Sequence, residues 1–126
     1  YPYPILITMD HAEDEVVRNL TEVIHKHYEE FKNADPGSIG WAMDRQIFDW
    51  VVPYHAGAVS YFKSIGVWSV DFEKHNLQLV HRQEVLAAAW LAFLETDGSD
   101  DDSFKDRWSL AREEALEKAG MDPVWR

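Results

Sequence analysis

VVPYHAGAVSYFKSIGVW, residues 51–68, is the stretch of this chain that combines a helix start and a helix stop with an unusual set of polar and aromatic residues. Pro53 suits the first turn of a helix because its missing backbone N–H is not needed there. Gly66 suits a left-handed C-cap. The stretch therefore predicts one short helix, roughly three turns long at a rise of about 1.5 Å per residue.

His55 lies in the first turn of this predicted helix, where free N–H groups and the helix dipole can hold an anion. On one interpretation, His55 contacts an acidic ligand or a hinge. On the other, His55 and Tyr54 form hydrogen bonds with the preceding loop and fix the start of the helix. Every helix N-terminus needs such partners, which favours the structural interpretation.

Composition limits the possible functions of the chain. Its 126 residues fit one domain with a real core. Because Lys+Arg number 12 against Asp+Glu 23, for a formal charge of −11, nucleic acid and anionic membrane surfaces are not expected partners. The absence of cysteine excludes disulfides, thiol nucleophiles and Cys-type zinc sites. The chain has no run of about 18 apolar residues, so the sequence predicts no membrane-spanning helix.

The first part of the chain predicts one strand followed by a helix. Residues 1–8 are short, β-branched and aromatic, which suits an edge strand or an extended hinge segment. Asp10 and Glu13 resemble a capping box, and the helix after them should end before Pro36. Ser38 is a candidate cap for a weakly helical segment, although the run IFDWVV that follows is equally compatible with extended backbone. The first helix is indicated by apolar residues at three- and four-residue steps: Val17, Leu20, Ile24, Tyr28 and Phe31.

The second half of the chain predicts two further helices. Ser69 is a plausible N-cap for the longest one, residues 70–96, whose Ala run at 87–89 allows close helix approach. The turn DGSDDDS leads into a last amphipathic helix from Phe104, ended by Gly120. The predicted fold is mainly α, with about five helices and one short N-terminal strand in a single domain or fragment, residues 1–126.

Clustered acids and histidines raise the question of a metal site. DGSDDD departs from a calcium-binding EF-hand because Asp102 stands where Gly is needed and Trp108 where a bidentate Glu should be. A solvated helix-capping turn is the better interpretation. His81 and Glu84 share a helix face, but a zinc site needs three or four ligands. We therefore predict no metal ion, no cofactor and no set of catalytic residues.

The central stretch resembles a segment near the end of TAXI solute receptors, the extracytoplasmic substrate-binding subunits of tripartite ATP-independent periplasmic (TRAP) transporters. Upstream, YPYPILITMDHAEDEVVRNLTEVIHKHYEEF is similar to a strand of that family that ends in a threonine and an acidic turn before an amphipathic helix. One departure is Ala56, where the family pattern usually carries a second proline. The residues that carry the resemblance are Pro53, His55, Gly57, Ala58, Tyr61 and Gly66, with Phe62 where a second aromatic is expected.

The resemblance implies the C-terminal part of a two-lobed α/β periplasmic binding protein, type II-like. Residues 1–68 would be its hinge strand and helices, and residues 69–126 a helical extension. Such a receptor binds a small carboxylate or an amino acid such as glutamate and delivers it, chemically unchanged, to the TRAP membrane permease subunits. It is periplasmic or otherwise extracytoplasmic. The residues implied to contact the ligand or the hinge are Tyr1, Tyr3, Thr8 and His55.

The opening of the chain, without an initiator Met or signal peptide, suggests an excised part of such a receptor. Helices that normally cover a sheet keep an apolar face, so we also expect self-association or repacking. The alternative function is a stand-alone helical protein–protein interaction module.

Overall fold

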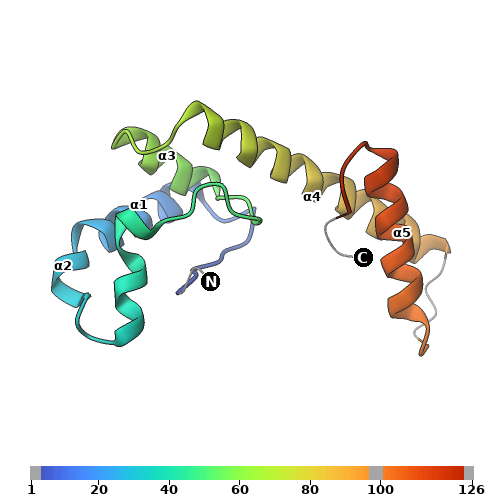
Figure 1. Cartoon of the computed structure of the whole chain (residues 1–126), viewed down its shortest axis with the longest axis horizontal. Helices are drawn as coiled ribbons and strands as arrows, with labels where there is room; N and C mark the ends of the chain where they lie inside the picture. Colours follow the sequence, from blue (N-terminus) through green and yellow to red (C-terminus); the bar gives the residue numbers. More distant parts are fainter. Residues whose placement is uncertain (1–3, 97–100, 124–126) are drawn as a thin grey trace. The chain divides into compact units, whose positions relative to one another are not determined.

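The computed structural model describes residues 4–96 and 101–123, and it is mainly helical, as the sequence predicts (Figure 1). The chain divides into two compact units, Tyr1–Asn76 and Leu77–Arg126, so the sequence-based division after residue 68 lies upstream of this boundary. The elements are α1 (Asp14–Lys26), α2 (Tyr28–Phe31), the 3-10 helices η1 (Pro36–Trp41) and η2 (Met43–Arg45), α3 (Ala56–Ser64), α4 (Val70–Thr96) and α5 (Phe104–Lys118).

The N-terminal strand is not observed in the described part of residues 1–8. Residues 5–9 have no regular structure, and Ile5, Leu6 and Ile7 are exposed. Because the described residues offer no second strand, the backbone groups here have no ladder to join. The two-lobed α/β architecture therefore has no counterpart within residues 4–96 and 101–123.

The first helix starts and ends differently from the prediction. Glu13 is the N-cap of α1 and makes no side-chain capping bond, so the predicted capping box with Asp10 is wrong. A turn in which the Ala12 N–H donates to the Met9 carbonyl keeps Asp10 outside the helix. The helix is then interrupted at His27, whose backbone leaves helical geometry before α2 begins.

Tight 3-10 turns occupy the segment predicted as weakly helical. Asp35, rather than Ser38, caps η1, because its carboxylate accepts the Gly37 N–H at 2.7 Å. Pro36 stands in the first turn of η1, where it needs no donor.

The central helix begins later than the sequence suggests. Pro53 lies before α3 instead of in its first turn, because His55 has extended backbone and is the N-cap. The predicted stop is confirmed, since Gly66 has a φ of 75° and the Val67 N–H returns to the Phe62 carbonyl.

The two C-terminal helices agree with the prediction. The Ser69 hydroxyl accepts the Phe72 N–H at 3.1 Å, as expected of an N-cap. At the end of α5, Gly120 has a φ of 72° and the Met121 N–H donates to the Leu116 carbonyl. Both contacts are local, which is why sequence patterns could predict them.

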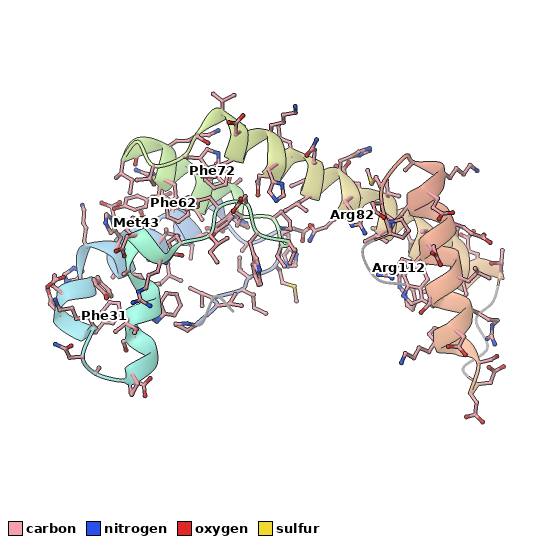
Figure 2. The ribbon with its side chains drawn as sticks, viewed as in Figure 1. Phe31, Met43, Phe62, Phe72, Arg82 and Arg112 are labelled. Atoms are coloured by element: carbon pink, nitrogen blue, oxygen red, sulfur yellow. The ribbon has the colours of Figure 1, made fainter. Side chains whose placement is uncertain are left out.

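An aromatic cluster forms the core of the first unit. Phe48 lies at its centre, with ring centroids 4.9 Å from Phe62 and 5.5 Å from Trp68. Phe72 and Met43, labelled with Phe62 in Figure 2, pack against this cluster. The loop before α3 and the start of α4 are thereby joined to α3.

In the second unit, α4 and α5 meet through four aromatic rings: Trp90 and Phe93 of α4, and Phe104 and Trp108 of α5. Leu116 is fully buried. Arg82, labelled on α4 in Figure 2, donates from Nη1 to the Asp122 carbonyl at 2.7 Å. Among the described helices, none combines the length and the apolar character needed to cross a lipid bilayer.

Candidate functional site

His55, which the resemblance implies as a ligand or hinge contact, is the N-cap of α3. Its Nδ1 accepts the Gly57 N–H at 3.1 Å and so caps α3. That bond requires an unprotonated Nδ1, so the neutral ring carries its proton on Nε2. The side chain is only 9 % exposed, and its Nδ1 lies 3.8 Å from Oδ1 of Asp14 on α1. The neutral ring therefore caps α3 through Nδ1 while it lies beside the start of α1.

Gly57 is the point of closest approach between α3 and α1. A Cβ added at this position would lie 2.2 Å from the Asp14 carbonyl oxygen and 3.0 Å from the Arg18 backbone nitrogen. Both neighbours are backbone atoms of a helix, which cannot move aside cheaply. Glycine at this position is thus a packing requirement.

Tyr61 joins the same two helices one turn further along α3. It is 3 % exposed, and its hydroxyl forms a 2.8 Å hydrogen bond with Nδ1 of His25 on α1. The guanidinium carbon of Arg18 lies 5.6 Å from the Tyr61 ring centroid, a cation–π distance. The α1–α3 interface is therefore polar as well as apolar.

Two buried nitrogen donors of this interface have no hydrogen-bond partner among the described protein atoms. They are Nε2 of His55 and Nη1 of Arg18. Buried polar groups are paired in the great majority of cases, and an unpaired one is costly. Both are donors, so the group that would satisfy them is an acceptor, such as a carboxylate oxygen.

The loop before α3 is held from its other side by α4. The Asn76 side chain, 9 % exposed, accepts the Tyr54 N–H at 2.7 Å and donates to the Tyr54 carbonyl at 3.3 Å. The Tyr54 hydroxyl donates to the Ile47 carbonyl, and burial, together with the charge of Asp49, raises the pKa of Tyr54. These contacts match the structural interpretation, in which the preceding loop is hydrogen-bonded next to His55.

Among the other predicted ligand residues, Thr8 lies in the described part of the chain. Thr8 is exposed in the segment without regular structure, and no hydrogen bond links it to His55. Tyr1 and Tyr3 lie outside the described residues. Ala58 is buried at the α3 face that packs in the core, as is Phe62.

Metal coordination has no candidate site in residues 4–96 and 101–123, where no three His, Asp or Glu side chains are placed to share an ion. Residues 97–100 of the acidic turn lie outside the described residues. Asp101 accepts hydrogen bonds from Ser103 and Arg107, which lower its pKa to about 2. Asp101 thus has the helix-capping surroundings expected of this turn.

Sequence reasoning did not identify the partners that hold the site together. Four residues were not predicted from the sequence to contact residues 54–61: Asp14, Arg18, His25 and Asn76. The available signal on α1 is spacing, because residues 14, 18, 21 and 25 recur at helical steps and share one face. Nothing local indicates Asn76, whose partner is 22 positions away in the chain.

No protein-family model, curated protein sequence or solved structure matches this chain significantly. The resemblance to TAXI receptors therefore stays a prediction from the residues of the sequence.

Proposed function

We propose that this chain is the C-terminal part of a TAXI-type TRAP receptor, located outside the cytoplasm. The receptor binds a small carboxylate or an amino acid such as glutamate and delivers it to the membrane permease without chemistry on the solute. In the complete receptor, two α/β lobes close around a hinge when ligand contacts favour the closed state.

The proposal rests on residues 53–66, where four residues of the family-like segment each have a different structural role. His55 caps α3, Gly57 permits the contact with α1, Tyr61 bonds to it, and Gly66 ends the helix. Residues that resemble a family segment and each have a separate structural task are harder to explain as a chance match. The segment would form a rigid element that docks helices within one lobe.

The two unpaired donors support an acidic ligand. Arg18 Nη1 on α1 and His55 Nε2 before α3 are each buried without a partner, and a carboxylate oxygen is the kind of acceptor that each of them needs. In the proposed receptor, such acceptors belong to the solute or to the opposite lobe.

Exposed apolar residues also fit a chain that is covered by further protein. Val16, Leu20 and Val23 are exposed on one stripe of α1, on a different side from Tyr61. Ile5 and Ile7 are exposed as well. In the proposed receptor these groups pack against the remainder of the lobe.

The test starts with the intact mass of the natural protein, compared with the mass encoded by the whole reading frame. We expect the reading frame to encode a longer receptor with a signal peptide. Calorimetric titration of that receptor with L-glutamate and small dicarboxylates should then show saturable binding. Arg18→Gln should weaken binding at least about tenfold if it loses a charged hydrogen bond, whereas Arg82→Gln in the second unit should not. Absence of binding to every solute tested would contradict the proposal.

A stand-alone helical interaction module is the second candidate function. The exposed α1 stripe favours it equally, because a protein partner would cover the same residues. A start codon next to Tyr1, together with a natural mass equal to that of the short chain, would support the module and end the transport proposal.

A further inference from the structure

Helix α4 carries apolar side chains on two opposite faces within the second unit. Phe93 is buried against α5, and Leu86 and Ala89 share its face at helical spacing. The opposite face is exposed, with Leu77 at 59 % and Leu91 at 63 %. A helix that is apolar on both sides needs two partners, and α5 supplies only one.

The exposed face, which we call the α4 stripe, has the spacing of a coiled coil. Its residues alternate steps of three and four, so they occupy successive a and d positions of a heptad repeat. The stripe extends for about 26 Å at a rise of about 1.5 Å per residue. Its members are Leu77, Val80, Glu84, Ala87, Leu91 and Leu94, and all six are exposed.

We infer that the α4 stripe pairs with the α4 stripe of a second copy of this chain in antiparallel orientation. The steps three, four, three, four, three read the same in both directions, so reversal of one helix keeps every layer in register. Leu77 then meets Leu94 of the second copy, and Val80 meets Leu91. In the central layers, Glu84 meets Ala87, which combines a long side chain with a small one.

Glu84 determines the orientation. In a parallel pair, the two Glu84 carboxylates would face each other in one layer, and like charges there oppose association. In the antiparallel pair, each Glu84 lies over the small Ala87 and its carboxylate can reach solvent beside His81, 3.3 Å away on its own helix. The stripe carries only this one carboxylate in a chain with a formal charge of −11, so it is a favourable place for two acidic molecules to meet.

Because the interface is short, we expect a reversible dimer whose population rises with protein concentration. Five apolar residues in each copy are far fewer than the roughly 20–30 residues a side of a standard interface, so the association is weak. This surface is independent of His55 and the α1–α3 interface. A monomeric chain would not contradict the proposed transport function, and absence of solute binding would not contradict the dimer.

Sedimentation equilibrium of the purified chain over a wide concentration range tests the pairing. Wild type should approach the dimer mass, and Leu91→Asp should weaken association at least about a hundredfold by placing a charge in an apolar layer. Leu110→Asp is the matched control, because Leu110 is 58 % exposed on α5, outside the stripe. A wild type that is monomeric throughout, or equal effects of the two variants, would overturn the inference.

Glu84→Leu provides a test that does not depend on loss of folding. It completes the apolar stripe and should tighten the dimer at least about tenfold, as expected when a charge is removed from an interface. Circular dichroism should show unchanged helix content. Unchanged or weaker association of this variant would contradict the inference.

Because the chain contains no cysteine, introduced cysteines can report the relative orientation of the two α4 helices by disulfide crosslinking. A tagged Leu77→Cys chain is mixed with an untagged Leu94→Cys chain and oxidised. Antiparallel pairing predicts mainly the mixed disulfide, because Leu77 of one copy lies opposite Leu94 of the other. Crosslinking of Leu77→Cys mainly to itself would indicate a parallel pair and reject the proposed geometry.

Discussion

Gly57 is the residue that limits how closely α3 approaches α1. Gly57→Ala should destabilise the protein by about 1–3 kcal/mol, because the new Cβ would lie 2.2 Å from the Asp14 carbonyl oxygen. Helix propensity alone would favour alanine by about 1 kcal/mol, so a net loss reports the clash. Urea unfolding measures the change. Ser60→Ala, at an exposed position of α3, is the control and should stay within about 0.5 kcal/mol of wild type. Equal stability of both variants would show that the helices separate easily.

Asp101 gives the first turn of α5 a pH dependence at the residue scale. Hydrogen bonds from Arg107 and Ser103 lower its pKa from an ordinary 3.8 to about 2. A depressed pKa in the folded state means that the carboxylate stabilises the fold above about pH 4, and that this contribution disappears as the pH falls towards 2. Thermal melts of wild type and Asp101→Asn should therefore differ at pH 6 and converge near pH 2. Asp102→Asn is the control for loss of an adjacent exposed charge, and a difference that persists at low pH would contradict this prediction.

At the scale of elements, the hydrogen bond between Tyr61 and His25 links α3 to α1. Tyr61→Phe keeps the ring but removes the hydroxyl, and should cost about 1 kcal/mol. His25→Phe removes the other partner while keeping an aromatic ring beside Tyr61. A double-mutant cycle should give a coupling energy of about 1 kcal/mol, because the second substitution cannot lose the bond again. Strict additivity would indicate that the bond does not contribute to docking.

At the scale of the whole molecule, a core substitution in one compact unit should destabilise that unit more than the other. Leu116 is fully buried in the second unit, so Leu116→Ala should destabilise that unit by about 2–5 kcal/mol. Amide hydrogen exchange should accelerate most in α5 and less in α1 and α3, because the units open separately. Leu110→Ala, at an exposed position of the same helix, should leave exchange nearly unchanged. Equal acceleration throughout the described helices would indicate one cooperative unit instead.

The sequence by itself determined the features that depend on neighbours in the chain. The mainly α class, the bounds of α4 and the glycine stops at Gly66 and Gly120 follow from helical spacing, capping side chains and the freedom of glycine at positive φ. These effects act within a few residues and so leave a pattern that can be read locally.

Only the tertiary structure decided the rest. Whether residues 4–8 form a strand depends on a pairing partner that no local pattern supplies, and within the described residues none is present. The start of α3 at Ala56 depends on His55, whose side chain is buried in the tertiary structure and caps the helix. Tyr61 and His25 are separated by 36 positions. Such pairings are set by how whole helix faces pack, and many different partners satisfy the same sequence pattern.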